Sequence, residues 1–146
     1  MAPPVWKLCK EGKLTEVREA LVLGEEDVNS KDENNRTGLM WAAMHRNNTI
    51  VRLLLEQPTL DLNAANWCGK TGLHHAVFYG NTEAVALLLA DPRLDSFNHK
   101  DKAGETPVML ALKRPHGDEL RLLADHPTVD LDTMNGSGRS LEGLAR

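Results

Sequence analysis

Apolar residues in this chain gather in short runs that recur at a fixed distance. The segments RTGLMWAA (36–43), KTGLHHAV (70–77), ETPVMLAL (105–112) and RSLEGLAR (139–146) align, and their Thr or Ser residues lie at positions 37, 71, 106 and 140. The spacings are 34, 35 and 34 residues. Self-similarity at such a period is typical of repeat proteins, in which each unit stacks on the next.

Two further registers have the same period. The segments EEDVN, TLDLN, LDSFN and TVDLD end at Asn29, Asn63, Asn98 and Asp132, again with spacings of 34, 35 and 34 residues. Prolines at positions 58, 92 and 127 each lie 21 residues after the Thr of their unit. The one additional residue of the middle unit is placed near Ser96, in a loop, where insertion is best tolerated.

Each unit is predicted to contain two short helices. In TGLHHAVFYG (71–80) a Thr precedes the apolar run and a Gly ends it, and in NTEAVALLLADP (81–92) an Asn or Thr cap, an acidic first turn and a Pro frame a second run. A loop and a Gly-containing turn follow, as in NAANWCGKTG (63–72). Because neither helix is long enough to be stable alone, each is expected to bury its apolar face on the neighbouring unit. The chain is therefore predicted to be an all-α solenoid of helix-turn-helix units joined by β-turn or hairpin-like loops.

The segments TGLHHA and TPVMLA, the leucine triplets at 53–55 and 87–89 and the closing DVN resemble the ankyrin repeat. The resemblance spans essentially the whole chain and implies a single domain over residues 1–146. It divides that domain into an N-terminal repeat (5–31), three repeats (32–65, 66–100 and 101–134) and a partial C-terminal repeat (135–146). The partial repeat is interpreted either as a degenerate cap or as part of a longer array.

Several residues depart from the ankyrin pattern and are expected to weaken the stack. Met40 and Met109 replace the usual histidine, and Glu119 occupies a position that is normally apolar. Gly38 and Gly72 replace a helix-opening proline, so the preset backbone angle of proline is given up at both positions.

The resemblance also assigns structural roles. Thr37, Thr71 and Thr106 are expected to begin the first helix of each unit. His74 matches the histidine that, in ankyrin repeats, bridges its own Thr to the backbone of the adjoining turn and ties neighbouring units together. Trp41, on the equivalent helix one unit earlier, is expected to belong to the core.

Composition and charge narrow the functional classes. The net charge is -4, and no window gathers the five or six basic residues of a nucleic-acid footprint, so nucleic acid is not an expected partner. No secretory signal and no apolar run of about 18 residues is present, so no membrane association is expected. Cys9 and Cys68 carry no CxxC spacing, which favours a reducing compartment. A cytoplasmic monomer is the expectation, with the nucleus as the alternative location.

Residues 66–80 contain side chains that could form an enzyme site or a metal site. Cys68, His74 and His75 are potential metal ligands. Adjacent residues on a helix point about 100° apart, so the two histidines do not converge on one ion, and no sequence feature designates a base for the Cys68 thiol. The sequence therefore predicts no catalysis, no cofactor and no metal.

Recognition is the remaining function. In ankyrin repeats the turn tips and the exposed face of each first helix line a concave groove, and the register carries its variable positions onto this chain. These positions are Glu33, Asn34, Arg36, Met44 and His45, then Trp67, Cys68, Lys70, Phe78 and Tyr79, then Lys102, Ala103, Glu105, Lys113 and Arg114. Three of the six aromatic residues of the chain, Trp67, Phe78 and Tyr79, fall among the five candidate groove positions of one repeat. Aromatic anchors dominate many interfaces, so a hot spot is predicted there.

Neighbouring side chains define the expected partner. Met44 adds an adaptable apolar contact, and cations at Arg36, Lys70, Lys113 and Arg114 are expected to surround the aromatic centre. We therefore expect a protein or peptide partner with apolar anchors and flanking acidic residues, bound by a module of a scaffold or adaptor. A stand-alone inhibitor of another enzyme, such as a kinase, is the alternative. Packing between neighbouring helices remains an alternative to the contact role for Phe78 or Tyr79.

Two asparagines suggest a modification. Asn29 and Asn63 each follow a leucine by eight residues, at Leu21 and Leu55, and close a D-V-N or D-L-N segment. This pattern resembles the sites of the asparagine hydroxylase that acts on ankyrin repeats. The alternative is an asparagine that stabilises its own loop by hydrogen bonding to the backbone.

Overall fold

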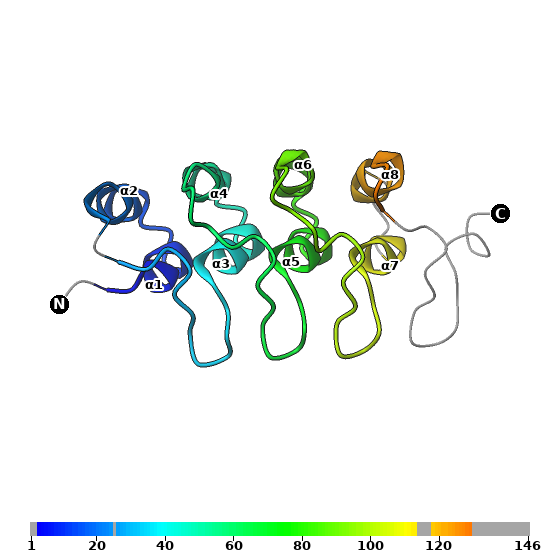
Figure 1. The fold of residues 1–146 in the computed structure, drawn as a ribbon, viewed down its shortest axis with the longest axis horizontal. Coiled ribbons are helices and arrows are strands. Elements are labelled where there is room, and N and C mark those ends of the chain that lie inside the picture. The colour runs from blue at the N-terminus through cyan, green and yellow to red at the C-terminus, as the bar shows by residue number, and fades with distance from the viewer. Residues whose placement is uncertain (1–2, 25, 114–117, 130–146) are drawn as a thin grey trace.

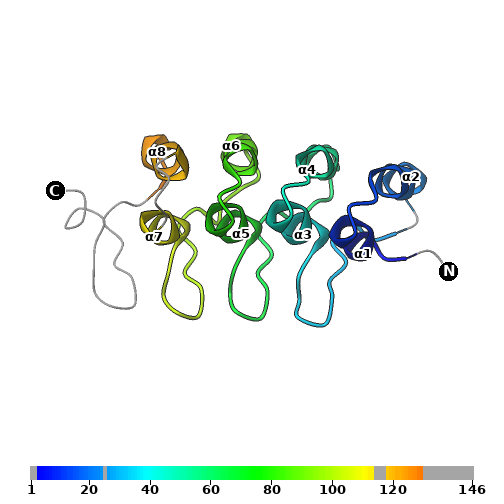
Figure 2. The same cartoon turned by 180° about the vertical axis from the view of Figure 1, so that it is seen from behind.

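Two rows of helices form the molecule (Figure 1). The computed structural model describes residues 3–24, 26–113 and 118–129. The inner row consists of α1 (Val5–Lys10), α3 (Gly38–Met44), α5 (Gly72–Phe78) and α7 (Pro107–Leu112). The outer row consists of α2 (Leu14–Leu23), α4 (Asn48–Leu55), α6 (Thr82–Ala90) and α8 (Asp118–Asp125). Figure 2 shows the turns projecting from the inner row, away from the outer row. The predicted all-α repeat fold is confirmed, and within the described ranges the extended structure is one isolated bridge between Lys31 and Thr37.

A threonine precedes each of three inner helices. Thr37, Thr71 and Thr106 have extended backbones at the N-cap, and each side-chain oxygen accepts a hydrogen bond from the backbone N–H three residues later. The capped N–H groups would otherwise have no partner inside the helix. The outer helix α6 is capped in the same manner by Asn81, whose side chain accepts from the Ala84 N–H at 3.2 Å.

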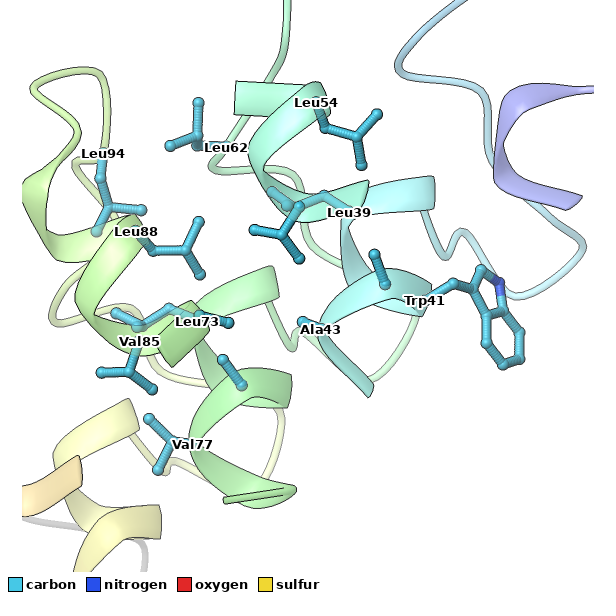
Figure 3. Packing of buried hydrophobic residues seen from close by; sticks show 14 of the residues in the cluster. Leu39, Trp41, Ala43, Leu54, Leu62, Leu73, Val77, Val85, Leu88 and Leu94 are labelled. Atoms are coloured by element: carbon cyan, nitrogen blue, oxygen red, sulfur yellow. The ribbon is translucent and has the colours of Figure 1, made fainter. Parts of the chain in front are cut away.

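The apolar core follows the length of the stack. Leucines from inner helices (Leu39, Leu73), outer helices (Leu54, Leu88) and loops (Leu62, Leu94) form one buried cluster, part of which is drawn in Figure 3. Trp41 lies at the edge of the leucine cluster in Figure 3 and is only 6% exposed, so its expected place in the core is confirmed. Each unit thus supplies apolar surface to both of its neighbours, as a solenoid requires.

Gly38 has a packing role that differs from the weakness expected for it. A Cβ atom at this position would lie 2.9 Å from the Cys9 Sγ and 3.5 Å from the Trp6 Cα, because α3 packs directly against α1. At Gly72 the nearest atom would be Cδ2 of Leu39, at 3.3 Å. The absence of a side chain therefore permits the close approach of neighbouring inner helices, most strictly at Gly38.

The other departures from the repeat pattern are buried. Met40 and Met109 are each 1% exposed and fill the histidine position with apolar atoms. Glu119 is 2% exposed, and its Oε1 accepts a hydrogen bond from the Thr82 hydroxyl at 2.8 Å, whereas its Oε2 has no hydrogen-bond partner among the described residues. A buried carboxyl group with one hydrogen bond is costly to the folded state.

The close contact at Gly38 leads to a prediction for stability. Gly38→Ala should lower the free energy of unfolding by about 1–3 kcal/mol, because the new methyl overlaps the buried Cys9 sulfur. Gly72→Ala should cost less than Gly38→Ala, since the end of the flexible Leu39 side chain can shift. Urea unfolding followed by circular dichroism measures both.

A double mutant distinguishes overlap with the Cys9 sulfur from a general intolerance of any side chain at position 38. Cys9→Ala removes the overlapping sulfur, so Gly38→Ala should cost less in the Cys9→Ala background than in the parent chain. Equal costs in both backgrounds would show that the Cys9 contact is not the reason for glycine at position 38.

Candidate functional site

Each turn is held in shape by one side chain at its beginning. Asp32 Oδ1 accepts hydrogen bonds from the N–H groups of Asn34 and Arg36, both at 2.9 Å. The same pattern, from the N–H groups two and four residues later, occurs at Asn66 (2.9 and 3.0 Å) and at Asp101 (2.9 and 2.9 Å). Asp and Asn favour such turns because their short side chains mimic a backbone carbonyl.

The second polar atom of each bracing side chain reaches another part of the stack. Asp32 Oδ2 accepts from the Trp41 Nε1 at 3.1 Å and from Arg36 Nε at 2.8 Å. In the following units, Asn66 Nδ2 lies 3.2 Å from the His75 Nε2, and Asp101 Oδ2 accepts from the Lys70 Nζ at 2.5 Å. These contacts attach the turns to the inner helices and to each other.

The three bracing residues were missed in the sequence analysis, although a signal for them was present. Asp32, Asn66 and Asp101 recur with spacings of 34 and 35 residues, each five residues before a Thr cap. Burial alone would raise the pKa of Asp32 and Asp101, but backbone N–H donors, with Arg36 and Trp41 at Asp32 and Lys70 at Asp101, lower both pKa values overall.

Main-chain hydrogen bonds align neighbouring turns. The Trp67 N–H donates to the Asn34 carbonyl at 3.2 Å, and the Lys102 N–H donates to the Cys68 carbonyl at 3.0 Å. Gly69 has a φ of +77°, and a Cβ there would lie 3.1 Å from the Asp101 Cα. Only glycine combines this left-handed backbone with so close an approach. The turn that carries Trp67 is therefore held by both of its neighbours.

The three aromatic residues at the candidate groove positions of this repeat lie exposed. Trp67 is 61% exposed, Phe78 47% and Tyr79 37%. Phe78 ends α5 and Tyr79 is its C-cap, with ring centroids 5.0 Å apart. The Tyr79 carbonyl accepts a hydrogen bond from the Arg46 Nη2 at 2.8 Å. We call Trp67, Phe78 and Tyr79 the aromatic set.

His75 connects the turn to the aromatic set. Its Nε2 lies against the Asn66 side chain, the residue before Trp67, and its ring centroid is 6.4 Å from that of Tyr79. One repeat earlier the equivalent positions hold Trp41 and His45, whose rings stack with centroids 5.6 Å apart. Ring side chains therefore occupy the same two helix positions in consecutive repeats.

Two cations lie over the Trp41 ring, and Met44 is partly buried. The Arg36 guanidinium carbon lies 4.2 Å and the Lys10 Nζ 4.8 Å from the ring centroid of Trp41. His45 is exposed, whereas Met44 is half-buried and packs against the core. The contact area that Met44 offers to a partner is correspondingly smaller than that of the aromatic set.

The three expected cations that lie among the described residues are already paired within the chain. Arg36 pairs with Asp32 at 2.8 Å, Lys70 with Asp101 at 2.5 Å, and Lys113 pairs with Glu105. Arg114 lies outside the described residues. Arg36, Lys70 and Lys113 were expected to be available to an acidic partner, but carboxylates of the same chain compensate their charges.

His74 contacts its own cap and the next turn. Its Nδ1 accepts from the Thr71 N–H at 3.1 Å and lies 2.9 Å from the Thr71 Oγ1, while its Nε2 lies 3.0 Å from the Glu105 carbonyl. An Nε2–H donor and an Nδ1 acceptor satisfy these contacts, which corresponds to the neutral ring. Burial lowers the pKa of His74 to about 4, although Glu105 and Asp101 oppose the shift.

His75 is also held neutral. Burial is the main reason that its pKa is lowered to about 4, and the nearby His74, Lys70 and Arg36 lower it further. Its ring meets the Asn66 amide and not an acid, so no carboxylate offsets the loss of hydration.

The two asparagines proposed as modification sites hold consecutive repeats together. Asn29 donates to the Thr59 carbonyl and accepts from the Asp61 N–H, both at 2.8 Å. Asn63 donates to the Arg93 carbonyl at 3.0 Å and accepts from Asp95, and from Ser96 twice. These contacts favour the interpretation that both asparagines stabilise a loop by hydrogen bonding. The loop they stabilise belongs to the next repeat, whereas the sequence suggested their own loop.

In the described part of the chain, no group of three or more His, Cys, Asp or Glu side chains is placed to hold a metal ion. Cys68 is exposed, and burial raises the pKa of the Cys9 thiol to about 12. None of the described helices has the length and apolar character needed to cross a membrane.

Comparison with protein families identifies a match over most of the chain. The family model described as ankyrin repeats in three copies matches residues 6–96. No curated protein matches the chain.

The neutral histidines predict a loss of stability in mild acid. His74 and His75 have folded pKa values of about 4 against an ordinary 6.5. The unfolded chain therefore binds more protons between these values, and the free energy of unfolding should fall as the pH decreases from about 6.5 to 4. Each unit of pKa difference corresponds to about 1.4 kcal/mol for one histidine.

Urea unfolding at pH 7, 6, 5 and 4.5 measures this slope. His75→Gln retains an amide opposite Asn66 but does not titrate, so its free energy of unfolding should fall less steeply over the same range. A slope identical to that of the parent chain would refute the assignment to His75.

Proposed function

Because the chain belongs to the ankyrin repeat family, we propose that it binds a protein or peptide in a concave groove between its turns and inner helices. Ankyrin repeats are generally protein–protein interaction modules and are typically non-catalytic. Ankyrin stacks bind many unrelated targets, so the fold alone does not identify the ligand and the exposed side chains must carry the argument. The module would serve a larger scaffold or adaptor assembly.

The exposure of the aromatic set is the observation that supports this proposal best. In the described ranges, large apolar side chains are exposed at five positions, and three of them are Trp67, Phe78 and Tyr79. Tryptophan and tyrosine bring a large apolar area and a polar group at low entropic cost, and they dominate many binding hot spots. Their concentration in one repeat supports a binding role, since exposed apolar residues elsewhere on a surface are usually scattered.

The anchors are held on rigid supports. Trp67 lies in a turn fixed by the Asn66 side chain and by hydrogen bonds to both neighbouring turns. Tyr79 is the C-cap of α5, and its carbonyl accepts a hydrogen bond from Arg46 of the preceding repeat. A surface whose backbone is already ordered loses less conformational entropy when it binds.

Charge adds less to the proposed interface than the aromatic contacts do. Because Arg36 and Lys70 are half-buried and already paired, an acidic group of the partner would gain little from them. The Lys113 side chain is 59% exposed and remains accessible beside Glu105. We therefore assign binding energy mainly to apolar anchors of the partner, with its acidic residues at the rim, where ion pairs contribute modestly.

Affinity capture tests the aromatic set. Trp67→Ala/Tyr79→Ala should lose partners that the parent chain captures, with an affinity at least about tenfold lower, since one lost anchor costs on the order of 2 kcal/mol. Both side chains are exposed, so the double variant should keep its helical circular dichroism.

Val22→Ala is the matched control. Val22 is 80% exposed and lies on α2, outside the proposed groove, so this variant should retain the captured proteins. If the folded aromatic variant also retains all of them, the proposed groove is wrong.

A further inference from the structure

A second exposed apolar surface lies at the end of the stack, away from the aromatic set. The remaining exposed large apolar residues of the described ranges are Val22 and Leu23, at 80% and 68% exposure, and they end α2. Figure 1 shows α2 at the N-terminal end of the outer row. Its helix contacts are with α1 and α4, whereas α4 lies between α2 and α6. One side of α2 therefore has no outer helix packed against it.

A small cavity occupies this side of α2. Pro3, Leu8, Ala20 and Leu23 form its apolar walls, and its volume is about 230 Å³. An apolar cavity of about 150 Å³ holds a benzene ring. The cavity therefore has room for one large apolar side chain.

Charged residues form the rim of the cavity. Lys13, Glu16 and Glu19 border it, and Lys13 lies 3.4 Å from a Glu11 oxygen and 3.9 Å from a Glu16 oxygen. Among the described residues, Glu19 takes part in no ion pair. The rim thus has one lysine shared by two glutamates, and at Glu19 a negative charge that forms no ion pair with any residue of the described ranges.

The residues follow one face of the helix. Glu16, Ala20 and Leu23 are spaced by four and three positions, so they lie above one another on α2. The face spans about two turns, or about 10 Å. The length of this face and its position in the outer row suit a second helix packed alongside α2, in the same way that α4 packs against the other side of α2.

We propose that this face, which we call the α2 slot, is a docking site for an amphipathic helix of a partner protein. One large apolar side chain of that helix enters the cavity between Leu8 and Leu23. A lysine or arginine one turn away meets Glu19 and Glu16. The site is separate from the proposed groove and does not depend on it.

Titration of the isotope-labelled full chain with two synthetic helical peptides tests the proposal. One alanine-rich peptide carries a single Trp with a Lys four residues to either side, and the other has Glu in place of Lys. The Lys peptide should shift the backbone amide resonances of α2 and bind at least tenfold more tightly than the Glu peptide. Added salt should weaken its binding.

Three variants locate the interaction. Leu23→Ser and Glu19→Lys should each weaken binding of the Lys peptide at least tenfold, because they remove the apolar wall and the uncompensated charge. Val22→Ser is the matched control, because Val22 adjoins Leu23, is more exposed and borders a different cavity. It should leave binding unchanged.

Several outcomes would overturn the proposal. These are equal binding of the two peptides, an equal effect of Val22→Ser and Leu23→Ser, or an absence of binding. Shifts confined to residues 67–79 would assign the peptide to the groove. Concentration-dependent shifts of α2 without peptide would identify a second copy of the chain as the occupant. Failure of the groove is measured separately by the Trp67→Ala/Tyr79→Ala capture.

Discussion

Every helix of the described chain depends on its neighbours, because the helices are only six to ten residues long and isolated helices below about 12 residues are marginal in water. Stability must come from the contact of one unit with the next. Leu39 and Leu73 supply that contact from successive inner helices, and Gly38 lets α3 approach α1 until a methyl group no longer fits. A stack of this kind gains its stability from nearest-neighbour interfaces, so a local defect acts first on two adjoining units.

Stacking also determines the geometry of the turns. Asp32, Asn66 and Asp101 each close a turn with one atom and use another to reach an inner helix or a neighbouring turn. His74 adds a contact from a buried helix to the carbonyl of Glu105 in the next turn. The turn tips are therefore rigid extensions of the helical stack, and a side chain on a tip is presented on an ordered backbone.

The candidate site was predictable in its positions but not in its electrostatics. Register alone placed Trp67 and Tyr79 on positions that prove exposed. It could not show that Lys70 is paired with Asp101, since these residues lie 31 positions apart and meet only when two turns align. The cavity beside α2 was not predicted for a similar reason, because Leu8 of α1 and Leu23 of α2 line it together only in the assembled stack.

Periodicity by itself determined the fold class and the helix starts at Thr37, Thr71 and Thr106, because a repeated local pattern has one way to bury its apolar faces. Only the tertiary structure decided the role of Gly38 and the pairing of Lys70 with Asp101. In the sequence, Gly38 is a residue that weakens a helix, and only the position of the Cys9 sulfur explains why a larger residue does not fit. In the same way, Lys70 is a free cation in the sequence, and only the structure shows that it pairs with Asp101. Both contacts depend on the distance between residues of neighbouring units, and the period of a repeat does not give this distance.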